Sequence, residues 1–135
     1  MAPCHVSCAD KTRKRTLRVG TFSAPVLNWF CYTDNIIYVI RCKRCTDVMV
    51  YYVGETEQLI YNRITNHRCK GGMYDHFKSH HLGTPMAGNI EVFIMSTHEP
   101  DFNIRSANEQ KLRRDMRLGA EDANIAVIIL SKEMN

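Results

Sequence analysis

No stretch of the sequence approaches the about 20 consecutive apolar residues of a membrane-spanning helix, so no transmembrane helix is expected. The first residues, MAPCHVSCADK, lack the apolar core of a secretory signal peptide, and we therefore expect an intracellular protein, nuclear if the source is eukaryotic. Internal repeats and low-complexity tracts are also absent. The 135 residues suffice for one domain with a modest core, and 44% apolar and 24% charged content is ordinary for a globular protein.

Acidic residues are fewer than basic ones, 14 against 18, which gives a formal net charge of +4 and a pI near 8.8. A balance of this size permits a polyanionic partner but does not require one. Residues 11–18 (KTRKRTLR) hold several basic side chains and no acidic one. We expect residues 1–20 to be a flexible basic arm that is a solvated tail, a phosphate-binding arm or a nuclear import signal.

The lack of an export signal also affects how the six cysteines are interpreted, because disulfides form mainly in oxidising compartments. Metal binding or free thiols are therefore favoured. Cys42-x2-Cys45 and His76-x3-His80 each have the spacing of half of a structural zinc site, and together they complete a tetrahedral shell. His81 can replace His80 in this set. The alternative is two free thiols in a hairpin turn and exposed histidines.

Two short runs rich in Ile, Val and Tyr, residues 36–40 and 48–53, are joined by a polar, basic hexamer. Such a pair predicts a β-hairpin, and Gly54 is expected to end its second strand. Thr56 stands in the position of an N-cap, so a helix is predicted from there to about His67.

The rest of the chain predicts a smaller set of elements around this unit. They are a short helix over residues 73–79, a strand over 90–95, a helix from Ser106 to about Leu118 that Gly119 ends, and a buried strand over 125–130. Strands that first form a hairpin and then alternate with helices indicate an α+β fold, loosely α/β, with a small mixed sheet of three to four strands and flanking helices. We place this domain over residues 21–135.

Residues 35–68 resemble the GIY-YIG endonuclease family. Residues 36–38 (IIY) match its first motif and residues 52–54 (YVG) match its second. Arg63 and His67 follow at the family's spacing, and their i, i+4 separation places them on one face of the predicted helix.

The resemblance is greatest to the endonuclease domain of Penelope-like retroelements, which carry a cysteine pair between the two motifs, a VGET sequence after it and downstream histidines. VGET stands here at residues 53–56. One letter differs, because Ile36 stands where the family signature has its first glycine. The resemblance extends from roughly Asn35 to Leu130 and implies the GIY-YIG type of fold.

This resemblance implies a Mg²⁺-dependent (or Mn²⁺-dependent) endonuclease that nicks DNA by attack of water on a phosphodiester. Arg63 would stabilise the charge that develops on the phosphoryl oxygens. His67 would orient a phosphate or assist proton transfer, and Tyr38 and Tyr52 would handle the nucleophile. A phenol with a pKa near 10 is a poor base at neutral pH, so a nearby cation must lower that pKa. The non-catalytic alternatives are that the tyrosines are aromatic core residues and that Arg63 and His67 are solvated helix residues.

Glu109 corresponds to the single metal-binding glutamate that the family carries on the helix after the third strand. A carboxylate suits Mg²⁺, which takes one or two protein ligands and keeps several waters. The alternative is a capping box, because Ser106 and Glu109 have S-x-x-E spacing. Asn124 matches the asparagine that closes the family signature; its alternative is a turn residue before the last strand.

A protein of a different class also fits the sequence. It is a catalytically idle DNA-binding module that uses the same fold and is stabilised by zinc. The presence of both Arg63 and Glu109 favours the enzyme.

Overall fold

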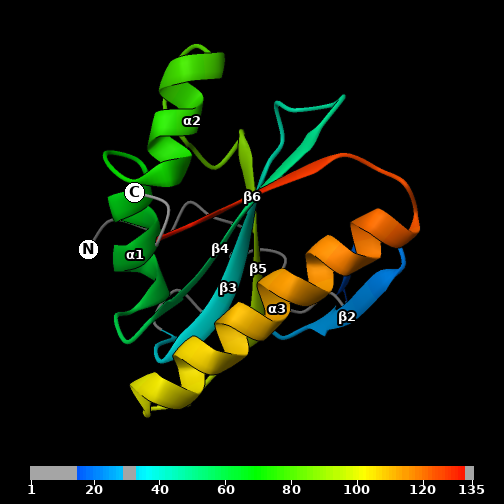
Figure 1. Cartoon of the computed structure of the whole chain (residues 1–135). Helices are drawn as coiled ribbons and strands as arrows, with labels where there is room; N and C mark the ends of the chain where they lie inside the picture. Colours follow the sequence, from blue (N-terminus) through cyan, green and yellow to red (C-terminus); the bar gives the residue numbers. More distant parts are fainter. Residues whose placement is uncertain (1–14, 29–32, 133–135) are drawn as a thin grey trace.

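The computed structural model describes residues 15–28 and 33–132 (Figure 1). Its elements in chain order are β1 (Arg15–Val19), β2 (Phe22–Val26), β3 (Ile36–Cys42), β4 (Met49–Thr56), α1 (Ile60–His67), α2 (Gly72–His80), β5 (Ile90–Ser96), α3 (Phe102–Asp122) and β6 (Val127–Ser131). Among the described residues, no helix combines the length and the apolar character needed to cross a membrane.

Four strands form one mixed sheet in the order β5-β3-β4-β6. Strand β3 pairs antiparallel with β4 and β5, and β4 pairs parallel with β6. Helices α1 and α2 lie on one side of this sheet, and α3 lies on the other side with the antiparallel β1–β2 hairpin (Figure 1). This arrangement confirms the predicted α+β fold with a small mixed sheet and flanking helices.

Strand β3 is buried on both faces, as its continuous apolar sequence predicts. Tyr38 faces the core that α1 and α2 cover, whereas Val39 faces the core that α3 and the hairpin cover. Side chains alternate along a strand, so β4 likewise directs Tyr52 to the first core and Val53 to the second. Both motif tyrosines therefore lie on the α1 side of the sheet.

Strand β4 continues through Gly54 to Thr56, beyond its predicted end. Gly54 pairs with Tyr38, and a Cβ atom there would lie 2.8 Å from the Tyr38 hydroxyl oxygen, so the glycine provides space rather than a turn. The predicted N-cap is also wrong. Thr56 Oγ1 accepts a hydrogen bond from the backbone nitrogen of Gln58 (3.0 Å), and α1 begins only at Ile60. Thr56 thus orders the turn after β4 instead of capping the helix.

Helix α3 is longer than predicted at both ends. The carboxylate of Asp101 caps it by accepting hydrogen bonds from the backbone nitrogens of Asn103 (2.8 Å) and Ile104 (3.3 Å), which leaves Ser106 inside the helix. The helix also runs through Gly119, where a Cβ atom would lie 2.5 Å from a backbone oxygen of β1. Gly119 therefore permits close approach of the hairpin and does not end the helix.

Residues 1–20 are predicted to be a flexible arm, but the last part of that segment is strand β1. Alternate residues of β1, Leu17 and Val19, are buried in the core between α3 and the sheet. The guanidinium of Arg15 pairs with the carboxylate of Glu91 in β5 (3.1 Å). The first fourteen residues of the predicted arm lie outside the described part of the chain. So do three cysteines to which the sequence assigns no role: Cys4, Cys8 and Cys31.

Candidate functional site

Tyr38 and Tyr52 lie side by side beneath α1, with ring centroids 6.2 Å apart. Arg63 of α1 donates a hydrogen bond from Nε to the Tyr38 hydroxyl oxygen (2.9 Å) and from Nη2 to the Tyr52 hydroxyl oxygen (3.3 Å). The Tyr38 hydroxyl also lies 2.8 Å from His67 Nε2, and the His67 ring meets both tyrosine rings edge to face. These four predicted site residues form one hydrogen-bonded group, the tyrosine–arginine cluster.

Burial sets the protonation states in this cluster. It raises the pKa of Tyr38 and of Tyr52 above the ordinary value of 10.0, and the Arg63 cation offsets only part of that rise. Burial and the Arg63 cation lower the pKa of His67 to about 3. At neutral pH both phenols are therefore protonated and the imidazole is neutral. The Arg63 cation is therefore too weak an influence to bring either phenol pKa below its ordinary value, and neutral His67 carries no charge that could do so.

The Tyr38 hydroxyl is the centre of the hydrogen bonding in this cluster. Its oxygen accepts a hydrogen bond from Arg63, and the hydroxyl shares a second hydrogen bond with Nε2 of the neutral His67 ring. Within the described part of the chain, His67 Nδ1 is buried without a hydrogen-bond partner. Tyr38, Tyr52 and His67 are all buried, so Arg63 is the member of the cluster that reaches solvent.

Arg63 lines a cavity of about 610 Å³ between α1, the end of β4 and the start of α3. Glu109 of α3 lines an adjoining cavity of about 330 Å³. Both cavities have Glu55, Phe102 and Lys132 in their walls. The two cavities together are called the cleft below, and they place an arginine and a glutamate around the same open space.

Glu109 is a buried residue near the middle of α3. Arg113, one turn later, donates from Nε to Glu109 Oε2 (3.2 Å) and from Nη1 to Ser131 Oγ in β6 (3.0 Å). Since Asp101 caps α3 and Ser106 lies inside it, the capping-box alternative for Glu109 is excluded. Glu109 is instead a carboxylate in the wall of the cleft.

The oxygen donors around the smaller cavity fit a hard divalent cation. The side chains of Glu109, Glu55 and Ser106 line it, and Mg²⁺ and Mn²⁺ prefer such oxygen ligands. Glu109 would hold the ion there, with water completing its shell. Each carboxylate also forms an ion pair, Glu109 with Arg113 and Glu55 with Arg105. A bound ion would therefore share each carboxylate with a guanidinium.

The ion pair between Arg105 and Glu55 was not found from the sequence. Arg105 is buried and donates from Nε to Glu55 Oε1 (3.0 Å), and from Nη1 to Asn35 Oδ1 (3.3 Å) and the backbone oxygen of Glu99 (2.8 Å). These contacts hold the start of α3 against the end of β4, beside the cleft. Local spacing carries no signal for this pair, because Glu55 and Arg105 are 50 positions apart in the sequence and meet only in the folded chain.

Asn124 lies apart from the cleft, in the exposed turn between α3 and β6. Its φ of 55° is in the left-handed region, which asparagine tolerates better than most residues. Its backbone nitrogen donates to the oxygen of Glu121 (3.0 Å). Asn124 is not one of the lining residues of either cavity of the cleft. This placement agrees with the alternative of a turn residue before the last strand.

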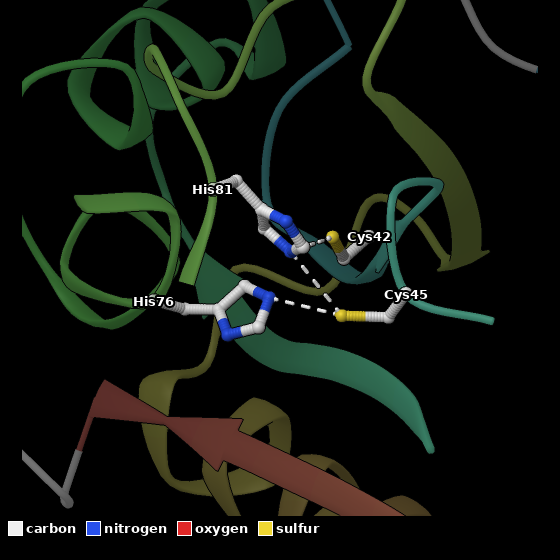
Figure 2. A group of neighbouring side chains, drawn as sticks. All are labelled: Cys42, Cys45, His76 and His81. Atoms are coloured by element: carbon white, nitrogen blue, oxygen red, sulfur yellow. Dashed lines mark hydrogen bonds between the residues drawn. The ribbon is translucent and has the colours of Figure 1, made fainter. Parts of the chain in front are cut away.

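A second cluster joins the β3–β4 connection to α2. Figure 2 shows the side chains of Cys42, Cys45, His76 and His81 pointing toward one another, and their ligand atoms all lie within 4.8 Å of each other. Cys45 Sγ is 3.3 Å from Nε2 of both His76 and His81, and Cys42 Sγ is 3.4 Å from His81 Nε2. Two sulfur and two imidazole donors that converge in this way can hold a metal ion such as zinc.

The structure places His81, the predicted alternative, beside the cysteines in the position expected for His80. Helix α2 ends at His80, which remains exposed, and the extended backbone of His81 (φ −136°, ψ 164°) carries its ring to the cysteines. Burial and the neighbouring imidazoles lower the pKa of His76 to about 4, so its ring is in the neutral form that binds metals. Burial and the adjacent Cys42 raise the pKa of Cys45 to about 11, so a bound cation would be needed to hold Cys45 as a thiolate at neutral pH.

Comparison with protein families gives a match to the GIY-YIG catalytic domain over residues 34–117. The matched segment runs from β3 into α3 and contains the tyrosine–arginine cluster and Glu109 but not Asn124. No curated protein and no solved structure matches the chain. Since the match covers more than half of the 135 residues, and the mixed sheet and the cluster agree with it, the chain belongs to the GIY-YIG catalytic domain family.

Proposed function

We propose that this protein is a metal-dependent DNA endonuclease that hydrolyses a phosphodiester bond and leaves a nick. Membership of the GIY-YIG catalytic domain family implies a nuclease. The observation that carries the proposal is the position of Arg63. Two tyrosine hydroxyls hold its guanidinium at the wall of a cleft that Glu109 also lines.

Arg63 suits the stabilisation of a reacting phosphate. Its Nε and Nη2 donate to the tyrosines, and its remaining N–H groups are donors for the phosphoryl oxygens, on which negative charge develops during hydrolysis. Lys70 and Lys132 line the same cavity and add positive charge for the flanking phosphates. The cleft therefore combines a hydrogen-bonded guanidinium with two ammonium groups.

The raised pKa values of Tyr38 and Tyr52 support a positioning role for these residues at neutral pH. Their hydroxyls orient Arg63, and neutral His67 holds the Tyr38 hydroxyl in place through a hydrogen bond to Nε2. A divalent cation held by Glu109 would supply the positive charge that makes water more acidic and screens the phosphate. In this proposal the protein's own side chains bind the DNA, orient Arg63 and supply positive charge in the cleft.

The idle DNA-binding module remains the second candidate, because one observation favours it. Arg113 already pairs with Glu109, and a guanidinium competes with a cation for the same carboxylate. A protein of this class would bind DNA through the cleft and leave it intact.

We further propose that Cys42, Cys45, His76 and His81 hold a structural zinc ion, with no ligand position left for substrate. The support is the convergence of two thiols and two imidazoles from separate parts of the chain. A cysteine pair between the two motifs also supports kinship with Penelope-like retroelement nucleases, which would act in the nucleus of a eukaryote.

Incubation of the full chain with supercoiled plasmid tests the nuclease. We expect open-circular product with Mg²⁺ or Mn²⁺ and none without a divalent ion. Arg63→Ala should lower the nicking rate by about 10²–10³-fold, the effect of removing one fixed donor to a developing charge. Glu109→Gln should abolish metal-dependent nicking while the protein stays folded and binds DNA.

Two exposed residues provide matched controls, Arg117→Ala for the arginine and Glu121→Gln for the glutamate, and both variants should nick at the wild-type rate. DNA binding without nicking in either ion would establish the idle module instead. Unchanged nicking by Glu109→Gln would remove Glu109 from the metal site.

A further inference from the structure

Phe102 is an exposed aromatic residue in the wall of the cleft. It is the first residue of α3, its side chain is 55% exposed, and it lines both cavities. Single exposed apolar residues are common on protein surfaces and usually need no explanation. Ile104, two residues later, is such a case, since it is 46% exposed and lines neither cavity of the cleft. Phe102 differs because its ring meets the space that Arg63 faces.

The larger cavity offers more than a phosphate site. Its volume of about 610 Å³ lies within the range of cavities that take small organic ligands. Besides Arg63 and the lysines, its wall contains Glu57 and Gln58, whose side chains can accept and donate hydrogen bonds. These groups match the parts of a nucleotide. An aromatic ring can stack on the base, the hydrogen-bonding side chains can contact the edge of the base, and the cations can bind the phosphate.

We propose that Phe102 is a stacking platform for one nucleobase beside the scissile phosphate, so that the protein prefers DNA in which that nucleotide is unpaired. The inference rests on the proposed nuclease and specifies its substrate. A base inside a duplex is covered on both faces by its neighbours and reaches an aromatic side chain only by leaving the stack. Extrusion costs a few kcal/mol, about as much as the ~1–3 kcal/mol gained by stacking on an aromatic ring, so intact duplex gains little.

Binding measurements separate the base from the backbone. The full chain is titrated against three labelled DNA molecules with no divalent metal added: a perfect duplex, the same duplex with a one-nucleotide bulge, and that bulge without its base. We expect the bulge with a base to bind about 5- to 140-fold more tightly than the abasic bulge, which corresponds to ~1–3 kcal/mol of stacking at 1.4 kcal/mol per tenfold.

Variants then assign the difference to Phe102. Phe102→Ala should abolish the preference for the base and leave binding of the abasic bulge unchanged, whereas Phe102→Trp should retain the preference. Ile104→Ala, the matched exposed residue on the same helix, should behave as wild type. The inference is overturned if the wild type does not distinguish the two bulges, or if Phe102→Ala weakens binding of both equally.

The two proposals fail in different ways. If the plasmid is nicked but the base makes no difference to binding, the nuclease stands and the stacking platform falls. If the base preference depends on Phe102 but no ion supports nicking, the nucleobase site stands and the enzyme falls.

Discussion

Arg63 is held in place by uncharged partners. The hydroxyls of Tyr38 and Tyr52 accept its hydrogen bonds, and none of the ion pairs among the described residues involves it. Arg105 and Arg113, by contrast, are each paired with a carboxylate. The charge of Arg63 is therefore oriented by its neighbours without being neutralised, which suits a residue that binds an anion.

Acidification should destabilise the protein through His67. Unfolded histidine has a pKa near 6.5 and the folded side chain a pKa of about 3, so below pH 6.5 the unfolded state binds more protons. The stabilisation is complete above pH 6.5 and is lost as the pH falls toward 3. Between pH 7 and pH 5 we expect a decrease of roughly 2 kcal/mol in the unfolding free energy, measured by urea denaturation.

His67→Phe is the control for this measurement, because it keeps an aromatic ring against the tyrosines but cannot titrate. His76, whose pKa is also lowered, is present in both proteins and its contribution cancels. An equal pH dependence in wild type and variant would show that His67 is not the responsible group.

Strand β3 was predictable as an element because its sequence is apolar enough to be buried on both faces. The prediction of a buried strand over 125–130 is wrong in part, because β6 begins at Val127 and lies at the edge of the sheet, where Ile128 is exposed. Helix starts were less predictable. Thr56 and Ser106 look like N-caps in the sequence, yet the strand continues to the first and Asp101 caps the helix that contains the second. A cap depends on one or two hydrogen bonds, and sheet pairing over several residues outweighs it.

The β1–β2 hairpin was missed because the basic residues in its first strand suggested a solvated arm. Leu17 and Val19 nevertheless alternate with polar residues, which is the pattern of a strand with one buried face. In the site, the motif residues were found from the resemblance to the GIY-YIG family. The pairing of Arg105 with Glu55, and the choice of His81 over His80, depend on tertiary contacts and on where a helix ends, which spacing does not reveal.

Gly119→Ala should destabilise the protein by crowding the contact between α3 and the β1–β2 hairpin. Alanine favours a helix by about 1 kcal/mol over glycine, but the new Cβ atom would lie 2.5 Å from both the Val19 oxygen and Phe22 Cβ. The hydrogen bond from Thr21 to the Gly119 oxygen (3.0 Å) fixes that approach. Overpacking of this kind costs about 1–3 kcal/mol, so we expect net destabilisation in chemical denaturation. Gly88→Ala, with no atom within 4 Å, should be neutral, and a neutral Gly119→Ala would contradict this packing.

Across the whole molecule, the cysteine–histidine cluster and the cleft share one hydrophobic core. Cys42 and Tyr38 lie in the same cluster of buried residues, and α2 contributes Met73 and Phe77 to it. Apolar packing therefore also attaches α2 to the sheet, so zinc is not its sole attachment. Loss of zinc should loosen this corner without dispersing the tyrosine–arginine cluster.

Metal content tests the zinc site. We expect about one zinc ion per chain in protein never exposed to chelator, and a lower melting temperature after chelation, because the free energy of metal binding adds to that of folding. His81→Ala should lose the zinc and His80→Ala should keep it. In the same way, Cys45→Ser should lose the zinc and Cys69→Ser should keep it. A zinc content near zero in the wild type, or its persistence in His81→Ala, would exclude this ligand set.

Strand β6 joins the sheet beside residues that are far away along the chain, since Met49 pairs with Val127. Closing so long a loop costs chain entropy before any contact offsets it. We therefore expect β4–β6 pairing to come late in folding and the β3–β4 hairpin, which closes a short loop, to form early. Ser131 of β6 accepts a hydrogen bond from Arg113, which in turn holds Glu109. During refolding, the cluster around Arg63 can therefore assemble first, and the carboxylate opposite it reaches its final setting only when the last strand docks.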